Sequence, residues 1–194
     1  MNIRPVTLTG TSGRLDPLSL DHLDGLCAAG LDDELWRFSV IQVRNRTDLE
    51  SYLRTALEEQ AAGRSLPFTI VSLLDQTVVG CTRYGNIDPL NRRVEIGWTW
   101  VGRRWQRSAV NTEAKLLLLT HAFDTLGCMR VEFKTDQLNE RSRQALRRIG
   151  AVEEGVLRRH MLTDQGRWRD SVYYSIVADE WPAVRAALRQ RLAR

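Results

Sequence analysis

The stretch WVGRRWQRSAVNTEAKLLLLTHAFDTLG, residues 100–127, holds the pattern that decides the fold: a strand end, an arginine-rich polar turn and a long helix. Apolar side chains in its second half recur every three or four positions, which is the spacing of an amphipathic helix. Ser108 and Asn111 stand where such a helix would be capped, and Glu113 falls in the first turn, where negative charge suits the helix dipole. Gly127 follows the last apolar residue and predicts the end of the helix.

A loop that runs into a helix in this way leaves several backbone N–H groups unpaired at the helix start. Such a terminus favours anions, because the free N–H groups and the helix dipole both attract negative charge. Arg103, Arg104 and Arg107 lie in the same turn, and their forked guanidinium groups suit a phosphate. The alternative is a capped surface helix with solvated arginines, and these residues leave both interpretations open.

The chain has 194 residues, which predicts one domain over residues 1–194, since single domains reach ~200 residues and bury a real core at that size. Its 43% hydrophobic and 27% charged residues are typical of a globular protein. The net charge is +4, and Lys115 and Lys134 are the only lysines among 28 basic residues. This excess is too small to predict a nucleic-acid partner and is compatible with small anionic ligands.

The three cysteines, Cys27, Cys81 and Cys128, lie far apart and form no CxxC pair. Their odd number and spacing argue against a disulfide scaffold and against a cysteine zinc site. We therefore expect reduced thiols in a cytoplasmic protein. The first ten residues lack the apolar segment of a secretory signal, and the longest apolar run, residues 116–119, is far below the about 20 residues of a membrane span.

The rest of the chain alternates between helical and strand-like segments. Helices are predicted over residues 19–29, 32–38, 45–62 and 139–149 and from residue 180 onward, in addition to the one that follows residue 108. Strands are predicted over residues 6–9, 68–74, 77–84, 93–101, 130–135, 151–162 and 168–177. Short turns join residues 68–101 into an antiparallel meander and residues 151–177 into a hairpin.

This order predicts an α/β fold of the α+β kind, with a mixed, mostly antiparallel central sheet flanked by helices. The connection from residues 93–101 through the long helix to residues 130–135 must lay these two strands parallel, or splayed, with a right-handed crossover. In a mostly antiparallel sheet, strand ends separate at such a place, and ligands bind there. The predicted ligand cleft therefore lies beside the arginine-rich turn.

Three runs carry a more specific signal: VEIGWTWV leading into RRWQRSAVNTEAKLLLLTHAFDTLG, RVEFKTDQLNERSRQALRRIGAVEEGVLRRH, and GRWRDSVYYSIVADEW. In this order they resemble the Gcn5-related N-acetyltransferase (GNAT) superfamily, and more narrowly its RimJ/RimL-type branch of ribosomal-protein acetyltransferases. The resemblance covers nearly the whole chain. The superfamily's pyrophosphate signature, Q/R-x-x-G-x-G/A, falls on residues 106–111, where Ala109 stands at the glycine position and Asn111 at the Gly/Ala position.

The resemblance implies the GNAT fold, in which a splayed strand pair forms the acetyl-CoA cleft, with acetyl-CoA as donor substrate and no metal. It also implies a homodimer. The pyrophosphate would bind the backbone N–H groups of the turn and first helical turn, the pantetheine arm would pair with the end of the strand, and an asparagine at the next helix would bond the cofactor arm. The implied cofactor-binding residues are Thr99, Trp100, Val101, Gln106, Arg107, Ser108, Ala109, Val110, Asn111, Thr112 and Asn139.

Many members of the superfamily carry a tyrosine seven residues after that asparagine, as the general acid that protonates the thiolate. Here the position holds Leu146. Ser142 lies one turn after Asn139 on the same helix face, so its hydroxyl is the candidate catalytic acid. The alternative is that Ser142 only caps or solvates its helix.

An amine must lose a proton before it attacks a thioester, so the reaction needs a base. Glu95 is the candidate, because an acid on an otherwise apolar strand beside a cleft suits that role. Strand alternation predicts that Glu95 shares a face with Gly97 and Thr99, and that Trp98 and Trp100 lie opposite.

The alternative for Glu95 is a strand-edge carboxylate paired with Arg93 or Arg130. The inner stripe of the long helix includes His121, which favours core packing over proton transfer for this residue. The weaker candidates for moving the proton are Asp136, Glu132, His121 and His160.

These residues predict an N-acetyltransferase that moves an acetyl group from acetyl-CoA to a primary amine of a protein N-terminus or a small molecule, by direct transfer in a ternary complex. One alternative is a module that binds CoA with little turnover, favoured by the altered signature. Another is a ribosome- or RNA-associated protein that uses the arginines of residues 141–148 and of the last helix. The acceptor stays open among a ribosomal protein's N-terminus, a free amino acid, a polyamine and an aminoglycoside.

Overall fold

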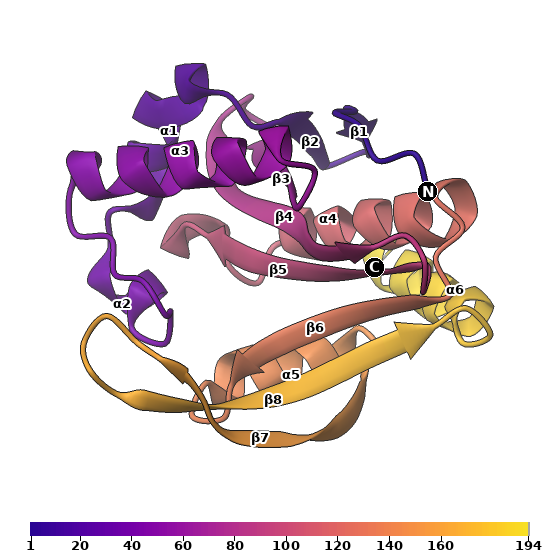
Figure 1. Cartoon of the computed structure of the whole chain (residues 1–194). Helices are drawn as coiled ribbons and strands as arrows, with labels where there is room; N and C mark the ends of the chain where they lie inside the picture. Colours follow the sequence, from indigo (N-terminus) through magenta and orange to yellow (C-terminus); the bar gives the residue numbers. More distant parts are fainter. Residues whose placement is uncertain (194) are drawn as a thin grey trace.

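The computed structural model describes residues 1–193, which form one eight-stranded sheet in the order β1-β2-β3-β4-β5-β6-β8-β7 (Figure 1). The strands are β1 (Leu8–Thr9), β2 (Gly13–Pro17), β3 (Leu66–Ser72), β4 (Val78–Asp88), β5 (Arg93–Val101), β6 (Arg130–Asp136), β7 (Val152–Leu162) and β8 (Trp168–Val177). The helices are α1 (Leu23–Gly30), α2 (Asp33–Trp36), α3 (Arg46–Ala61), α4 (Ala109–Thr120), α5 (Glu140–Arg148) and α6 (Trp181–Leu192). This is the mixed, mostly antiparallel α/β architecture that the order of segments predicts.

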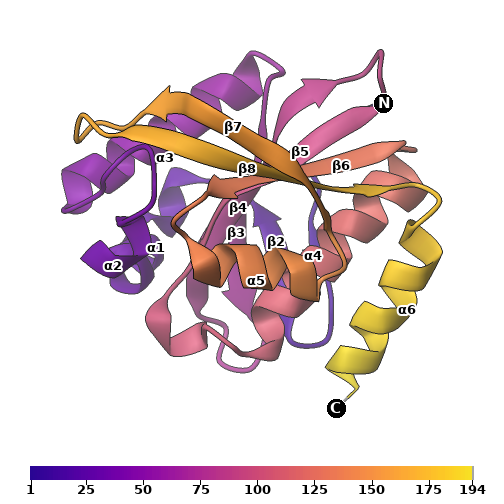
Figure 2. The same cartoon turned by 90° about the horizontal axis from the view of Figure 1, so that it is seen from below.

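Helices cover both faces of the sheet (Figure 2). We call the face under α1–α3 the α3 face, and the face under α4–α6 the α4 face. On the α3 face, an apolar cluster around Trp36, Tyr52 and Trp100 joins the first helices to β4 and β5. On the α4 face, a larger cluster includes Tyr84 and Phe133 and extends under α4 and α6. Within residues 1–193, no helix has the length and apolar character needed to cross a membrane.

The predicted meander and hairpin are confirmed: β3, β4 and β5 are antiparallel neighbours, and so are β7 and β8. The sequence does not predict β2, because residues 10–13 indicate a turn and the leucines that follow suggest only a lead into the first helix. Pairing with β3 makes this segment a strand, over a register from Gly13↔Ser72 to Pro17↔Phe68. Its strand conformation therefore depends on a tertiary contact that no local pattern shows.

The carboxylate of Glu113 holds the turn that precedes β2. It accepts hydrogen bonds from the backbone N–H groups of Thr11 (2.8 Å), Ser12 (2.6 Å) and Gly13 (2.6 Å), and from the Thr11 hydroxyl (2.9 Å). The expectation that Glu113 serves the dipole of its own helix is therefore wrong. Four charge-assisted bonds instead connect α4 to the N-terminal hairpin, and such bonds are stronger than neutral ones.

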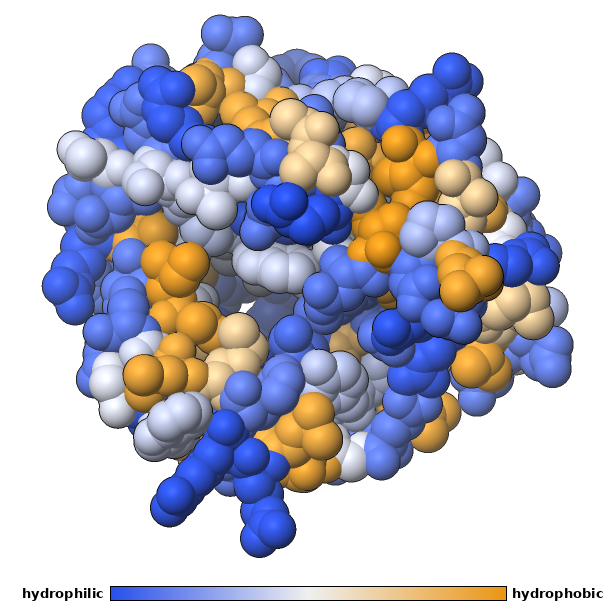
Figure 3. Space-filling view, in the orientation of Figure 1, coloured by the Kyte–Doolittle hydropathy of each residue, from blue (hydrophilic) through white to orange (hydrophobic). Residues whose placement is uncertain are grey.

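β5 and β6 run parallel but pair over only three residues, from Arg93↔Arg130 to Glu95↔Glu132. Beyond Glu95, β5 stays paired with β4 and β6 stays paired with β8, so the two strands diverge (Figure 1). The space-filling view shows a hollow between these two halves of the molecule (Figure 3). The predicted splay is thus confirmed, and we use this word for the gap between β5 and β6.

A β-bulge interrupts β5 beside the splay. Cys81 and Arg83 of β4 are two residues apart, but they pair with Trp100 and Gly97 of β5, which are three apart. The extra residue is accommodated at Trp98, whose φ is 51°, a left-handed value that costs energy in a non-glycine residue.

The bulge changes which side chains share a face. Thr99 points to the α4 face, where its hydroxyl accepts a hydrogen bond from Lys115 of α4, while Trp100 packs against Trp36 on the α3 face. Glu95 lies on the α3 face with both tryptophans of its strand. The expectation that Glu95 shares a face with Thr99 and lies opposite those tryptophans is therefore wrong, because alternation fails where a residue is inserted.

Candidate active site

Glu95 is the last residue of β5 that pairs with β6, so it lies where the splay begins. It is 3% exposed. Its Oε2 accepts a hydrogen bond from Asn86 Nδ2 at 2.7 Å and lies 3.4 Å from Lys134 Nζ. A buried carboxylate with two fixed donors keeps one orientation, toward the α3-face side of the gap.

The alternative partners proposed for Glu95 bind elsewhere. Arg93 Nη1 lies 3.0 Å and Arg130 Nε lies 2.8 Å from the carboxylate of Glu132. Asp136, which is buried, forms an ion pair with Arg167. The alternative interpretation, in which Glu95 pairs with either arginine, is therefore wrong, and the two weaker carboxylate candidates, Glu132 and Asp136, are engaged by cations of their own.

The two histidines differ in position. His121 is buried beneath α4 with its ring stacked near Tyr84, and burial lowers the pKa of His121, as suits a core residue. His160 of β7 lies on the α3 face, where its Nδ1 is 3.1 Å from Ser171 Oγ and its ring meets Tyr173 edge-on. Burial lowers the pKa of His160, and nearby positive charges add to that effect.

The start of α4 is uncapped. Of the two predicted candidates, Ser108 is the N-cap residue, but its hydroxyl donates to the carbonyl of Trp105 (2.6 Å), and no side chain of residues 1–193 caps the helix. Asn111 lies inside the first turn, and its buried Oδ1 has no hydrogen-bond partner within residues 1–193. The N–H groups of this turn are therefore available to a ligand, and an anion is the ligand that they suit.

The arginines of the preceding turn are not equally available. Arg103 is held by Asp32 through hydrogen bonds of 2.9 and 3.0 Å, and the Arg104 guanidinium lies over the Trp105 ring. Arg107 directly precedes the N-cap residue, is exposed, and has a left-handed φ of 64°. Of the three, Arg107 is therefore the best placed to meet an anion at the helix start.

The end of β5 leaves one backbone edge unpaired, since residues 96–101 bond β4 and have left β6. An unpaired strand edge offers N–H and C=O groups to an extended partner. Gln106 connects this end of the strand to α5: its Nε2 donates to the carbonyl of Val101 (3.1 Å), and its Oε1 accepts from Arg141 (3.0 Å). The residues proposed for the donor on β5, the turn and α4 thus form a continuous border on one side of the splay.

Lys115 is a residue of the splay that the sequence analysis missed. Its side chain is 8% exposed, and its Nζ lies 2.9 Å from Thr99 Oγ1 of β5 and 5.8 Å from the ring centroid of Phe133 of β6. Burial lowers the pKa of Lys115 to about 7. One feature of the sequence could have indicated a buried amine: Lys115, one of the chain's two lysines, stands on the apolar stripe of the long helix.

Asn139 is the N-cap of α5, and its Oδ1 accepts a hydrogen bond from the backbone N–H of Ser142 (3.0 Å). Its amide NH2 group is still able to donate to a ligand. Ser142 lies in the first turn of α5, on the α4 face, whereas Glu95 lies on the α3 face. The two predicted catalytic residues therefore lie on opposite faces of the sheet, and no hydrogen bond within residues 1–193 joins them.

The wall of the splay on the α3 face carries a stacked arginine. The Arg83 guanidinium lies between the rings of Tyr52 (5.1 Å) and Trp98 (4.9 Å) and bonds Glu59 at 2.8 Å. Trp98 is 38% exposed beside it. A large aromatic side chain thus borders the opening through which an acceptor would approach.

The tip of the β7–β8 hairpin closes the far end of this opening. The Asp164 N–H donates to the carbonyl of Val40 (3.0 Å), and the Asp164 carboxylate accepts from the N–H of Gln42 (2.7 Å). The two halves of the molecule are therefore connected at both ends of the splay, by the paired residues 93–95 and by this hairpin bridge. The hollow in Figure 3 lies between the two connections.

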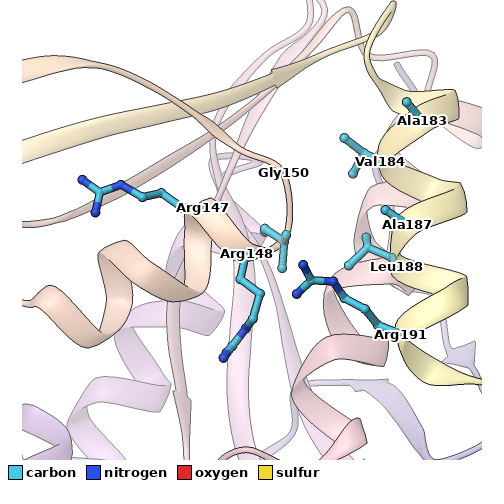
Figure 4. Close-up of a pocket in the computed structure, with 9 residues that line it drawn as sticks. Arg147, Arg148, Gly150, Ala183, Val184, Ala187, Leu188 and Arg191 are labelled. Atoms are coloured by element: carbon cyan, nitrogen blue, oxygen red, sulfur yellow. The ribbon is translucent and has the colours of Figure 1, made fainter. Parts of the chain in front are cut away.

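A second groove lies away from the splay, between the end of α5 and α6 (Figure 4). Its floor is apolar, with Val184 and Leu188, and its rim carries Arg147, Arg148 and Arg191. It includes none of the residues proposed for donor binding or catalysis.

Comparisons with known proteins agree with this geometry. A family model described as an acetyltransferase (GNAT) domain matches residues 14–152. YdaF of Bacillus subtilis, named as a ribosomal N-acetyltransferase, is 36% identical over 109 residues, which are 56% of this chain and 58% of that protein. The match thus spans little more than half the length of that relative.

Two solved structures are similar over almost their whole length. One, from T. thermophilus and named as an acetyltransferase, has 36% identity and a TM-score of 0.90, covering 99% of this chain and 100% of that one. The other is RimJ of Mycobacterium smegmatis in complex with CoA-disulfide. It has 26% identity and a TM-score of 0.83, and the match covers 96% of this chain and 95% of that one. The family model extends from β2 to the start of β7 and includes Glu95, the uncapped start of α4 and Asn139. The chain therefore belongs to the GNAT acetyltransferase family.

Proposed function

We propose that the chain, as one domain over residues 1–194, moves an acetyl group from acetyl-CoA to a primary amine by direct transfer in a ternary complex. The observation that carries this proposal is the splay, which the uncapped start of α4 and the buried carboxylate of Glu95 approach from opposite faces. An anionic donor and an amine acceptor would meet in this gap.

The donor would follow the border described above. Its pyrophosphate would accept hydrogen bonds from the N–H groups of residues 107–112, its pantetheine arm would pair with the free edge of residues 99–101, and Asn139 would donate to that arm. The complex of the RimJ relative with CoA-disulfide supports a CoA donor. Ala109 is small enough to let a phosphate approach the backbone, and Arg107 adds a positive charge.

The transfer would proceed through a tetrahedral intermediate. The neutral amine nitrogen forms a bond to the thioester carbonyl carbon, the carbonyl oxygen takes the negative charge, and collapse of this intermediate breaks the C–S bond. The amine proton passes to Glu95, directly or through water, and the departing thiolate takes a proton from Ser142 or solvent. A backbone N–H of β5 would stabilise the oxyanion.

The acceptor class is part of the proposal. The names of YdaF and of the RimJ structure support a protein N-terminus. A small amine is also compatible with the splay. Both acceptors present a primary amine at the α3-face opening, where Glu95 is held.

The test is thermal unfolding with excess acetyl-CoA, with NAD and ATP as controls. A ligand at about 100 times its Kd adds about 2.7 kcal/mol to the free energy of unfolding, which is a shift of several degrees for a chain of this size. A shift with acetyl-CoA alone is expected. Equal shifts with all three ligands, or none, would overturn the donor assignment.

A second candidate is a CoA-binding module with little turnover. It is favoured by Ala109 and Asn111 in the phosphate signature and by Leu146 at the position of the usual tyrosine. Acetyl-CoA binding without acetylation of any amine would support it. An RNA-associated role is less favoured, because Arg143 and Arg147 of α5 are engaged by Glu140 and Glu153.

A further inference from the structure

We infer that the acceptor is an amine that also carries a carboxylate, and that Arg169 binds this carboxylate. The inference rests on the proposed function and deepens it, since it names the chemical class of the second substrate.

Arg169 lies toward the hairpin end of the splay. Arg169 of β8 pairs with Met161 of β7. Two residues further along β8, Ser171 pairs with Asp136 at the end of β6. By alternation along β8, Arg169 lies on the same face as Tyr173, whose strand partner is Lys134. This is the α3 face, on which Glu95 is also held.

Arg169 is mostly buried, and its Nε is enclosed without a hydrogen-bond partner within residues 1–193. The residue is 7% exposed, and no carboxylate of residues 1–193 lies within ion-pair distance of it. A guanidinium group stays charged in proteins, so burial does not neutralise it. A buried, unpaired charge is costly, which indicates that its counter-charge comes from a ligand.

Arg169 takes no part in the two ion pairs beside it. Glu95 is matched by Lys134, and Asp136 by Arg167. Burial lowers the pKa of Arg169, and the charges of Asp136 and Glu95 oppose this effect without reaching hydrogen-bond distance. A ligand carboxylate would balance the charge, whereas a polyamine or an aminoglycoside would add further positive charge to it.

The arrangement gives the acceptor two ends. Its amine belongs near Glu95, where the splay begins, and its carboxylate belongs near Arg169, toward the hairpin. Lys134 and Tyr173 lie between the two positions on the same face. A free amino acid meets this requirement, and so does a peptide with an acidic residue close to its N-terminus.

The experiment compares matched acceptors with acetyl-CoA as donor and measures release of free thiol. In the first set of pairs, each standard amino acid is compared with its α-carboxamide, which lacks the carboxylate. In the second set, short peptides that begin with Asp or Glu are compared with peptides that begin with Asn or Gln. Spermidine and kanamycin serve as polycationic acceptors without a carboxylate. In the wild type, kcat/KM should be at least about tenfold higher for the acid of a pair, as expected for a charge-assisted bond. The pair that shows the preference identifies the source of the carboxylate.

Arg169→Gln should raise KM for the acid at least about tenfold, leave the amide unchanged and bring their ratio close to one. Arg169→Lys should retain part of the preference. Arg158→Gln is the matched control, since Arg158 is an exposed arginine of the same hairpin. Equal turnover of acids and amides by the wild type, or equal loss on both in Arg169→Gln, would overturn the inference.

A binding measurement covers the case in which no tested amine is acetylated. With CoA present, succinate should raise the melting temperature of the wild type and of Arg158→Gln but not of Arg169→Gln. Absence of that difference would also overturn the inference. Failure of the proposed function is distinguishable, because it would appear as no stabilisation by acetyl-CoA in any variant.

Discussion

Lys115 Nζ lies 2.9 Å from Thr99 Oγ1, so an amine buried under α4 reaches β5 at the place where β5 has left β6. The ring of Phe133 on β6 lies on the other side of that amine. One side chain thus spans the two walls of the splay. Because burial lowers the pKa of Lys115 to about 7, the amine is largely neutral at slightly alkaline pH.

This pKa predicts how stability changes with pH. Between about pH 7, the folded pKa of Lys115, and its ordinary value of 10.5, the unfolded chain binds more protons than the folded chain. The free energy of unfolding should therefore rise with pH in this window, by at most about 1.4 kcal/mol per pH unit from this group. Urea unfolding of Lys115→Met at pH 7, 8 and 9 should show a shallower rise than the wild type, and parallel slopes would contradict the assignment.

Glu95→Gln should separate catalysis from donor binding. The amide retains the shape and the contact with Asn86 but does not accept the proton of the amine, so kcat should fall by about 10²- to 10⁴-fold. The Kd for acetyl-CoA, measured by calorimetry, should stay within about twofold, because the proposed donor border lies elsewhere. Glu58→Gln, on the exposed side of α3, is the control. Undiminished turnover in Glu95→Gln would remove Glu95 from the mechanism.

Glu113→Ala should destabilise the fold, because three backbone N–H groups and one hydroxyl lose their acceptor. We expect a loss of about 3 kcal/mol or more, seen as a fall in melting temperature of about 6–12 °C. Glu58→Ala removes an exposed glutamate from a helix and should change stability by less than about 0.5 kcal/mol. Similar melting temperatures for the two variants would show that the hairpin does not depend on Glu113.

Arg107→Gly should have two opposite effects. Glycine adopts the left-handed φ of this position without strain, so the free energy of unfolding should rise by about 1 kcal/mol. Loss of the positive charge should weaken acetyl-CoA binding and reduce its dependence on salt, which titrations at low and high ionic strength would measure. Arg104→Gly is the matched control. Arg104 has no positive φ, so glycine at this position should only lower the free energy of unfolding. A Kd for Arg107→Gly equal to that of the wild type at both salt concentrations would exclude a phosphate contact.

Local patterns in the sequence were sufficient to predict those elements whose conformation depends on neighbouring residues in the chain. The apolar period of α4, the turn residues of the meander and the strand–helix–strand order predict the sheet and its splay, because each depends on residues close together in the chain. They also place the start of α4 at Ser108 or Asn111, of which Ser108 is the N-cap residue, and the start of α5 at Asn139. The proposed roles of these residues in donor binding and catalysis stay predictions until they are measured.

Other features depend on contacts across the fold. β2 exists because β3 and Glu113 hold it, and the bulge at Trp98 exists because β4 and β5 differ by one residue in register. Neither β2 nor the bulge is indicated by a periodic pattern of apolar residues in the sequence. Lys115 and Arg169 were missed for a related reason: a pattern of charged and apolar letters does not show that a charged side chain lies in the interior.

The hairpin bridge limits how an acceptor could reach Glu95, the proposed base. Since residues 93–95 connect the two halves at one end and Asp164 bonds residues 40 and 42 at the other, the gap is a closed ring and not an open slot. A gap that is open at one end admits a chain lengthwise from that end, whereas this gap admits an acceptor only through a face of the sheet. An acceptor amine, whether on a chain end or on a long side chain, would therefore have to enter perpendicular to the sheet, through the α3-face opening, to reach Glu95.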